Sequence, residues 1–554
     1  MKYIKPTIFA ILIINVALVF GQLANPNKKK LVRPNILFLT TDYTRAADLP
    51  VTGAPFLKAP AIEKLCNEGA VFRQHSCVSP ICMPARASIV TGHYPHSHGL
   101  WDNRSVATRK GDRAFLISEL KECGYQTVGI GKMHFYPRFA DYDYDIRVSL
   151  EGKDVAYRND DYEKYLESKG TSRRILKEEN KGNGLPSGQS YADWTFDEEL
   201  HADAFVGNKA LEVIEKKQLS DEKPWFMWVS FTGPHNPWNA PKRWADYYRA
   251  MTDLPNGEFV EGELDNKPID YTRHRFGYGG DLMRIYDKSS ETQKKEIRHN
   301  TRASHYGLLS FIDEYLQRII AELEKQNKLN NTLIIFTSDH GSGLFDNDML
   351  HKGASFPMHS LVPFVAWAPG YVEPGMRDHF SNHVDLYATF MELAGVENVK
   401  YNEGRSMVSM FYSDKSKVNE FNIIESTMVT SIMTDNWLAG FHHITGEKEL
   451  YNRKADPMCH YNLVNDEESK EIILTLEEQL VDWRRTLAGE HEIIGEDVTK
   501  WRSEIGDSAL IQKYFKGYMK SFNHLANMPD SAVGKTGKAA KLILEASSNL
   551  VVTK

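Results

Sequence analysis

The sequence predicts an α/β fold: a large domain with a central, mostly parallel sheet flanked by helices, plus a smaller C-terminal α+β subdomain with an antiparallel sheet. Two patterns support this fold class. From about residue 33 onward, short and continuously apolar segments alternate with amphipathic helical segments, which is typical of parallel α/β domains. After about residue 398, short alternating strand patterns are followed by one long amphipathic helical pattern.

Five short apolar segments are predicted to be strands of the main sheet. Their residues are continuously apolar and rich in β-branched and aromatic side chains, as expected for parallel strands buried on both faces. The segments are NILFLTT (35–41), TVGIG (127–131), WFMWVSF (225–231), TLIIFTSD (332–339) and VPFVAWAP (362–369). Helical periodicity lies between them, for example in residues 61–69 and 306–326.

The remaining segments set the expected domain organisation. Residues 140–220 and 250–300 are polar and charge-rich, so we interpret them as excursions outside the sheet. The C-terminal subdomain is predicted to contain short strands at 422–426, 437–444 and 448–452 and a helix at 468–489. We therefore divide the chain into a signal peptide (1–21), an α/β domain (33–398), an α+β subdomain (399–490) and a C-terminal extension (491–554).

The composition is that of an ordinary globular protein. Of 554 residues, 42% are hydrophobic and 25% are charged, which excludes a disordered, collagenous or multi-pass membrane protein. The formal net charge is −7 and is spread along the chain, which argues against a nucleic-acid partner. Five irregularly spaced cysteines provide neither a disulfide framework nor paired zinc ligands.

The N-terminus carries the pattern of a secretory signal peptide. A basic start with Lys2 and Lys5 precedes an apolar run over residues 7–20, and the small residue Gly21 follows. A membrane anchor is the alternative, but the run is shorter than the about 20 residues that a bilayer span needs. No cysteine follows the run to accept a lipid, so we expect an exported protein, periplasmic or secreted, without a membrane anchor.

Polar side chains follow the predicted strands at the points where the strands end. Ligands of doubly wound sheets bind beyond the carboxyl ends of the strands, so these side chains are expected at one edge. A single aspartate or histidine in such a place is more often a turn or cap residue, but the recurrence favours a functional site. The residues are Asp42, Lys132, His134, His235, Asp339 and His340.

Cys82 opens the segment CMPARASIVTG (82–92), which has the pattern of a helix start. A cysteine at a helix N-terminus faces free backbone N–H groups and the positive end of the helix dipole, which favour an anion. The alternatives are a buried thiol, or a disulfide with Cys77 in an oxidising exterior.

The pattern C-x-P-x-R, followed by four residues and T-G, resembles the signature of type I, formylglycine-dependent sulfatases of the alkaline phosphatase-like superfamily. Other segments are similar to that family's motifs and stand in its order: PNILFLTTD, GYQTVGIGKMH, GPHNPW and TLIIFTSDHG. The segment NWLAGFHHITGEKELYNRKADP resembles the family's closing subdomain, so the resemblance covers about residues 33–487. It implies a sulfuric ester hydrolase, and we take a polysaccharide sulfatase as the working hypothesis.

The resemblance implies that Cys82 is oxidised to formylglycine (3-oxoalanine) by a formylglycine-generating or sulfatase-maturing enzyme. The hydrated aldehyde would supply the nucleophilic oxygen. Asp42, Asp339, His340 and the modified Cys82 would hold a divalent cation, with Ca²⁺ expected and Mg²⁺ as the alternative. Oxygen ligands suit these hard cations, whereas His340 is an unusual ligand for them.

The same resemblance assigns the other site residues. Arg86 and Lys132 would stabilise the ionised diol, and His134 would hydrogen-bond it and assist proton transfer. Lys132, His235 and Lys352 would bind sulfate oxygens, with His235 as the candidate acid for the leaving alcohol. Such a set suits a sulfate ester, because cations and basic groups offset the negative charge that develops in the transition state.

The sequence departs from the family pattern in two places. The first metal strand ends in Asp42-Tyr43, where the family has a second acid or amide, so water or another residue would have to complete the metal shell. After Lys352 the chain reads SFPMHSLVP (355–363) in place of the usual acidic pair.

Two other functions stay open. Formylglycine-dependent phosphonate or phosphodiester hydrolases share the Cys82 signature, and a non-catalytic glycan-binding relative would keep Cys82 as a thiol. Sulfated poly- or oligosaccharide is the expected substrate, with Trp101, Trp238 and Trp244 as candidates for stacking on sugar rings. A polyanion-binding surface is a hypothesis for the basic residues between Lys267 and Arg302, which are Arg273, Arg275, Arg284, Lys288, Lys294, Lys295 and Arg298.

Overall fold

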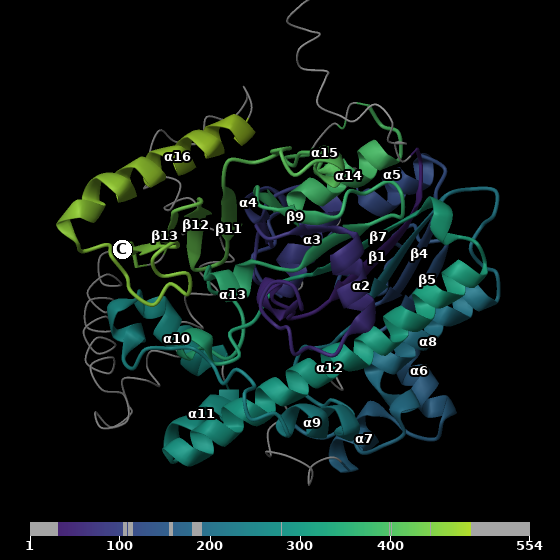
Figure 1. The fold of residues 1–554 in the computed structure, drawn as a ribbon, viewed down its shortest axis with the longest axis horizontal. Coiled ribbons are helices and arrows are strands. Elements are labelled where there is room, and N and C mark those ends of the chain that lie inside the picture. Colours follow the sequence, from purple (N-terminus) through teal and green to yellow (C-terminus); the bar gives the residue numbers. More distant parts are fainter. Residues whose placement is uncertain are drawn as a thin grey trace, which may run out of the picture.

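The structure is a computed structural model that describes residues 32–103, 108, 115–153, 159–179, 191–278, 280–397, 399, 402–443 and 445–488. The signal peptide predicted at 1–21 and the extension predicted at 491–554 lie outside the described residues. A main α/β body and a smaller sheet with one long covering helix can be followed in Figure 1.

The strands are short and nearly all buried. They are β1 (Asn35–Thr41), β2 (Ala70–Phe72), β3 (His75–Ser76), β4 (Gln126–Gly131), β5 (Ile146–Ser149), β6 (Trp225–Ser230), β7 (Thr332–Ser338), β8 (Phe364–Trp367), β9 (Gly375–Arg377), β10 (Ser381–Asn382), β11 (Asn422–Glu425), β12 (Val429–Met433), β13 (Trp437–His442) and β14 (Lys448–Asn452).

The helices differ widely in length, from single turns to the long α12. They are α2 (Pro60–Glu68), α3 (Cys82–Thr91), α4 (Pro95–His98), α5 (Leu116–Glu122), α6 (Asp161–Ser168), α7 (Arg173–Glu179), α8 (Ala202–Glu215), α9 (Lys242–Arg249), α10 (Ile269–Tyr278), α11 (Gly280–Lys288), α12 (Glu291–Lys325), α13 (Pro357–Ser360), α14 (Val384–Leu393), α15 (Val408–Tyr412) and α16 (Lys470–Ala488). Short 3₁₀ turns lie at Ala46–Asp48, Glu198–Leu200, Glu263–Asn266, Leu329–Asn331, Asp346–Asp348 and Glu467–Ser469.

The main sheet has eight strands in the order β5-β4-β6-β1-β7-β8-β2-β9. At its centre β1 pairs in parallel with both β6 and β7, so that Ile36 lies between Phe226 and Leu333. The prediction of a mostly parallel sheet is confirmed. One strand was predicted wrongly, because β8 runs antiparallel to both β7 and β2. The β7–β8 connection contains a short 3₁₀ turn (Asp346–Asp348) and the four-residue α13 but no long crossover helix, so the chain turns back along the sheet.

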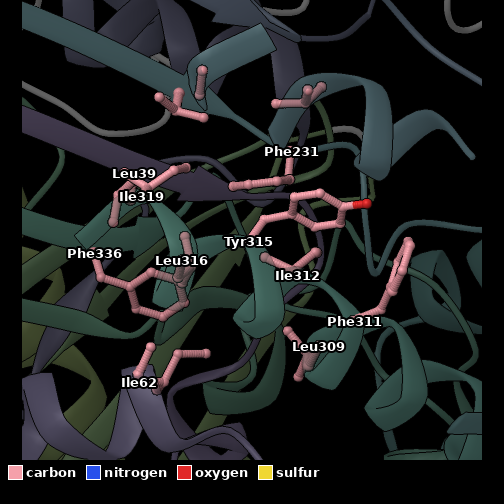
Figure 2. Packing of buried hydrophobic residues seen from close by; sticks show 14 of the residues in the cluster. Leu39, Ile62, Phe231, Leu309, Phe311, Ile312, Tyr315, Leu316, Ile319 and Phe336 are labelled. Carbon is pink, nitrogen blue, oxygen red and sulfur yellow. The ribbon is translucent and has the colours of Figure 1, made fainter. Parts of the chain in front are cut away.

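Helices cover both faces of this sheet. Leu37 and Leu39 of β1 belong to a core that includes α2, α8 and α12, whereas Ile36 and Phe38 belong to a core that includes α3, α5 and α14. Figure 2 shows α12 side chains, including Leu316, packed against strand residues of the first core. Because alternate residues of a strand point to opposite faces, a continuously apolar strand buries both of its faces between these layers.

Part of the segment 140–220 belongs to the main sheet, which corrects the interpretation of the whole segment as an excursion. Among its described residues, α6 and α7 do lie outside the sheet. β5 (146–149) pairs in parallel with β4 at the edge of the main sheet. Residues 202–215 form α8, most of whose residues are buried in the first core. The strand was missed because IRVS is short and only its last residue is buried, so it lacks the apolar run of a central strand. Residues 250–300 do stay outside the sheet, as α10, α11 and the start of α12.

The predicted antiparallel C-terminal subdomain is confirmed. Its four strands follow one another in the order β11-β12-β13-β14. The helix α16 packs on them through Leu476 and Leu480, which join a core with Ile423 and Ile432. Figure 1 shows α16 lying beside this sheet. Among the described residues, no helix is both long and apolar enough to cross a bilayer.

Candidate active site

Cys82 is the first residue of α3, preceded by Ile81 in an extended conformation. Its side chain is buried, and its Sγ lies 3.8 Å from both carboxylate oxygens of Asp42 and 3.2 Å from Nε2 of His340. Asp42 follows β1 and His340 follows β7, so the start of α3 brings the sulfur to the ends of two central strands. All five cysteines lie among the described residues and are free, so the alternative disulfide with Cys77 is not formed.

Two lysines lie beside the Cys82 sulfur. The Nζ atom of Lys352 is 2.6 Å from Sγ, and the Nζ atom of Lys132 is 3.9 Å from it. Lys132 also forms a buried ion pair with Asp42, at 2.5 Å from Oδ2. Lys352 comes from the loop between β7 and β8 rather than from a strand end, yet it is the nearer of the two cations.

Arg86 holds the second carboxylate of the site. It lies one turn into α3, is fully buried, and donates from Nε to Asp339 Oδ2 at 2.8 Å. Burial raises the pKa of Asp339, and the neighbouring charge of Asp42 raises it further. Two buried carboxylates so close to each other are stabilised when a cation lies between them.

The lysines also control the ionisation of Cys82 and Asp42. Burial opposes the charged form of both groups. For Cys82, the charges of Lys132 and Lys352 outweigh burial and hold the thiol pKa well below its ordinary value. For Asp42, burial and the Cys82 charge raise the pKa, but Lys132, His235 and Lys352 together bring it below its ordinary value. The site therefore stabilises negative charge at the position of Sγ.

The group formed by Asp42, Cys82, Asp339 and His340 fits a divalent cation. One ligand atom from each of these four buried residues lies within 4.8 Å of all the others. The Nδ1 atom of His340 donates to the carbonyl oxygen of Gly341 at 2.8 Å, which leaves the lone pair on Nε2. That Nε2 faces the oxygens Oδ1 of Asp42 and Oδ1 of Asp339, each at 3.6 Å. A histidine fixed in this way by its other ring nitrogen is typical of a metal ligand.

His134 and His235 complete the surroundings of Cys82. Burial lowers the pKa of both rings, to about 4 for His134, although hydrogen bonds to Cys82 act in the opposite direction. The Nδ1 atom of His235 donates to the carbonyl oxygen of Asn236 at 2.6 Å. The neutral ring therefore carries its lone pair on Nε2, which lies 3.5 Å from the Nζ atom of Lys352.

Comparison with protein families decides the family of this chain. Residues 34–396 match the model described as Sulfatase, which is more than half of the chain. The chain belongs to the sulfatase family. Residues 340–486 also match the model described as the C-terminal part of N-sulphoglucosamine sulphohydrolase. The protein is therefore a hydrolase of the sulfatase family. The strand-end residues described above lie together around its Cys82.

Individual relatives are distant. An arylsulfatase from Clostridium perfringens is 28% identical over 471 residues, which cover 81% of this chain and 94% of the relative. A solved structure of a protein with its substrate D-glucosamine-2-N,6-O-disulfate has a TM-score of 0.64 at 20% identity and covers 83% of this chain and 99% of that one. A phosphonate monoester hydrolase from Silicibacter pomeroyi has a TM-score of 0.70 at 20% identity and covers 82% and 95% of the two chains. Both solved structures therefore have the same fold as this chain.

Tyr43 gives this sulfatase an aromatic wall where the family pattern has a second metal ligand. Its backbone is left-handed, with φ of 82°, and its ring is almost fully buried. The ring centroid lies 4.2 Å from that of His235 and 5.0 Å from that of His340. The Nζ atom of Lys352 lies 4.6 Å from the Tyr43 centroid, which is a cation–π contact. Tyr43 thus packs against three of the predicted site residues.

The segment 355–363, the second place where the sequence departs from the family pattern, packs against the loop after β7. This segment contains α13, and the carbonyl oxygen of His359 accepts a hydrogen bond from the backbone N–H of Gly341 at 2.9 Å. The Gly341 backbone approaches so closely that a Cβ there would lie 2.1 Å from the carbonyl oxygen of Met358. The segment therefore holds the metal-site loop by backbone contacts and places no acid beside Lys352.

Several residues that the sequence suggested for glycan binding are buried. Trp238 is fully buried, with its ring stacked on His351 at a centroid distance of 5.7 Å, and Trp101 is 7% exposed. Trp244 is partly buried and donates from Nε1 to Glu314 at 3.0 Å. Trp238 and Trp101 are therefore packing residues in this structure.

The hypothesis of a polyanion-binding surface needs a similar correction. Arg275 is buried in ion pairs with Asp287 and Asp348. Arg298 is buried against the Tyr286 hydroxyl, at 2.5 Å. These two arginines are structural. The exposed residues of this basic segment include Arg284, Lys288 and Lys295. The side chain of Arg273 is not among the described ones.

Two buried charged residues near the site were not found from the sequence. Lys153 lies after β5, and Asp203 is the second residue of α8. Both contact the loop that carries His235. The edge strand before Lys153 was not recognised, so Lys153 was not identified as a strand-end residue. Asp203 resembles an ordinary acidic residue in the first turn of a helix, so its sequence position does not indicate a functional role.

Proposed function

We propose that the protein hydrolyses sulfate monoesters of sulfated carbohydrate, with Cys82 converted to formylglycine and a divalent cation bound beside it. The observation that carries this proposal is the position of the Cys82 sulfur. It lies within 4.8 Å of a ligand atom of each of three prospective metal ligands, Asp42, Asp339 and His340, and it contacts two lysines. In the proposed mature protein, Sγ stands in for an oxygen of the hydrated aldehyde.

Different residues of the chain would stabilise charge, position the metal ligands and transfer protons in such a reaction. Lys132 and Lys352 would neutralise the oxygen at position 82 and the sulfate oxygens, because their charges favour an anion there and lower the pKa of the thiol against the effect of burial. Arg86 keeps Asp339 in place and adds fixed positive charge. The new bond joins the oxygen at residue 82 to sulfur, the ester S–O bond breaks, and the alcohol leaves with a proton. The second hydroxyl of the hydrate then loses its proton and the C–O bond to sulfate breaks, so that sulfate leaves, the aldehyde forms again and water restores the hydrate.

His235 is our candidate for the donor of that proton. In its neutral form Nε2 bears the lone pair, so this atom has to take up a proton before it serves as an acid. His134 is the second candidate for proton transfer, because Cys82 lies close enough to raise the pKa of its ring against the effect of burial.

A bound divalent cation would offset the two buried carboxylates and polarise the oxygen at residue 82. We propose Ca²⁺ for this role, with Mg²⁺ as the alternative, on the strength of the family resemblance and the two carboxylate ligands. Elemental analysis of protein purified without chelator tests the choice. One equivalent of calcium or magnesium supports it, and one equivalent of a transition metal contradicts it.

Sulfated carbohydrate as substrate has support from the comparisons. The chain matches the C-terminal model of N-sulphoglucosamine sulphohydrolase, and one structural relative was solved with a disulfated glucosamine. The decisive test is a desulfation screen over defined sulfated mono- and oligosaccharides, scored by inorganic sulfate. The protein has to be produced with a formylglycine-generating or sulfatase-maturing enzyme. Sulfate release from a sulfated sugar supports the proposal, and release from none of them contradicts it.

Export is the second part of the proposal. The pattern of residues 1–21 supports a periplasmic or secreted protein. Fractionation of the producing cell, with an antibody against the folded domain, tests it. Recovery of the mature chain in the periplasm or medium is the expected result, and recovery only in the cytosol would contradict export.

A phosphonate or phosphodiester hydrolase is the second candidate function. The charge of the site suits it as well as it suits a sulfatase, because phosphonate monoesters, phosphodiesters and sulfate monoesters each carry one negative charge, and the cations Arg86, Lys132 and Lys352 all lie at the site. Comparing kcat/KM for 4-nitrophenyl sulfate with that for 4-nitrophenyl phenylphosphonate separates the two functions. A larger value for the sulfate supports the sulfatase. A non-catalytic relative would turn over neither ester and would retain the Cys82 thiol.

A further inference from the structure

The loop that carries His235 is held from two sides. On the side of β1, the backbone N–H of Phe231 donates to the carbonyl oxygen of Thr40 at 2.8 Å. The backbone N–H of Asp42 donates to the carbonyl oxygen of Gly233 at 3.0 Å. These contacts continue the sheet beyond β6. The other side of the loop meets two buried charged side chains, Asp203 and Lys153.

Asp203 binds the start of this loop with one carboxylate oxygen. Its Oδ1 accepts hydrogen bonds from Thr232 N at 2.8 Å, Thr232 Oγ1 at 2.9 Å and Gly233 N at 2.8 Å. The approach is close, because a Cβ at Gly233 would lie 2.6 Å from Oδ2 of Asp203. Hydrogen bonds to a charged acceptor are stronger than those between neutral groups, so these three bonds hold the start of the loop in one orientation.

Lys153 binds the middle and the end of the same loop. Its Nζ donates to the carbonyl oxygen of His235 at 3.0 Å and to Oδ1 of Asn239 at 3.4 Å. The Oδ2 atom of Asp203, which has no hydrogen-bond partner among the described residues, lies 3.9 Å from this Nζ. The side chains of both charged residues are buried, at 7% and 0% exposure for Lys153 and Asp203. They form one buried ion pair around the loop.

The orientation of the His235 ring depends on this backbone. Its Nδ1 donates to the carbonyl oxygen of Asn236, the next residue, and this contact directs Nε2 toward Lys352. Lys153 holds the preceding carbonyl, that of His235 itself. A shift of the loop would therefore move the ring relative to the Cys82 centre, and displacements of about 1 Å can cost about 100-fold in rate.

We propose that Lys153 and Asp203 are positioning residues that hold the 232–239 loop so that His235 meets the substrate at Cys82. The inference rests on the proposed function, since it assigns a role in that reaction. In this inference Lys153 and Asp203 neither bind the metal nor contact Cys82, and they act on the reaction only through the position of His235.

A double-mutant cycle between Lys153 and His235 tests the inference with 4-nitrophenyl sulfate, whose good leaving group keeps His235→Ala measurable. We expect Lys153→Met to lower kcat/KM by about tenfold or more in the otherwise native protein. In the His235→Ala background the same change should cost less than about twofold, because the residue that it positions is gone. Lys209→Met, which removes a partly exposed lysine of α8 paired with Glu212, is the matched control.

The outcomes are distinguishable. Equal losses from Lys153→Met in both backgrounds would show a general structural role and overturn the inference. If Lys153→Met does not fold, Lys153→Arg and Asp203→Asn enter the same cycle, since each keeps part of the hydrogen bonding. An inactive wild-type protein and an inactive control would instead overturn the proposed function, and the inference with it.

Discussion

The side-chain nitrogen of Lys352 lies 2.6 Å from the sulfur of Cys82, although 270 residues separate the two in the sequence. The Lys352 ammonium is buried, and it also lies over the Tyr43 ring. Burial lowers the pKa of Lys352, but the charges of Cys82, Asp42 and Asp339 outweigh burial and raise it, which favours the cationic form at the reacting position. Tyr43 and Cys82 thereby fix the position of one cation.

Lys352→Met should remove this cation while keeping the length of the side chain. We expect kcat/KM for 4-nitrophenyl sulfate to fall by about 100- to 1,000-fold, as for the loss of one charge-stabilising donor. Lys216→Met, which removes a lysine from the exposed end of α8, is the control. A loss of less than threefold for Lys352→Met would show that this lysine does not act on the transition state.

His340→Ala should weaken cation binding more than it changes the fold. It removes the only nitrogen among the four grouped ligand residues and leaves both carboxylates in place. Binding of a cation to the folded state raises the midpoint of thermal unfolding, so titration of Ca²⁺ or Mg²⁺ into chelator-treated protein measures the site without turnover. The wild type should gain stability with added ion and His340→Ala should gain less. Equal gains would exclude His340 as a ligand.

Arg275→Met should destabilise the protein rather than alter its substrate preference. The change leaves Asp348, which is half-buried, without its cationic partner. Burial raises the pKa of Asp348, and Arg275 acts against this effect. Because both acidic partners are partly exposed, breaking these ion pairs should cost about 1 to 2 kcal/mol, between the values for exposed and for buried pairs. We expect a clear drop in the midpoint of thermal unfolding, whereas Lys295→Met, at an exposed position of the same basic segment, should change it little. An unchanged midpoint together with a raised KM for a sulfated oligosaccharide would restore the polyanion-binding hypothesis.

Stability should fall on the alkaline side because of His442, which joins β13 to α10. Its Nδ1 lies 2.8 Å from Asp270, its Nε2 lies 3.5 Å from Glu449, and the edge of its ring meets Tyr271. Burial lowers the pKa of His442, but the hydrogen bond to Asp270 and the nearby charge of Glu449 outweigh burial and raise it from 6.5 to about 9. Because the folded state binds the proton more tightly, this contribution is complete below pH 6.5 and disappears as the pH rises through 9.

The size of this effect is on the order of 3 kcal/mol between pH 6 and 10. Midpoints of thermal unfolding measured across that range should decrease for the wild type, and His442→Gln should have a lower and flatter profile. If both proteins show the same slope, the charge of His442 does not contribute to stability.

The strand-end residues were predictable because parallel β-strands place their carboxyl ends at one edge. Asp42, Lys132 and Asp339 each follow a continuously apolar segment, and the structure brings all three to the surroundings of Cys82. Lys352 does not follow a strand, and only the family resemblance pointed to it. The fold class was predictable for the same reason, since buried parallel strands are continuously apolar.

The remaining features depend on tertiary contacts that leave no local pattern. The direction of β8 follows from the course of the β7–β8 connection, and β5 is too short and too polar to be recognised. Tyr43 could be identified as a departure, but its packing against His235 and Lys352 requires the folded loop. Lys153 contacts a carbonyl oxygen 82 residues away, which residue types alone do not indicate.

Sulfate release measured as a function of formylglycine content at residue 82 tests the central proposal most directly. Protein is produced with graded amounts of a maturing enzyme, and mass spectrometry of the Cys82 peptide gives the converted fraction, because formylglycine is lighter than cysteine. The rate of sulfate release should rise in proportion to that fraction, and Cys82→Ala should release none above background. Full activity in protein that retains only the Cys82 thiol would contradict the proposal.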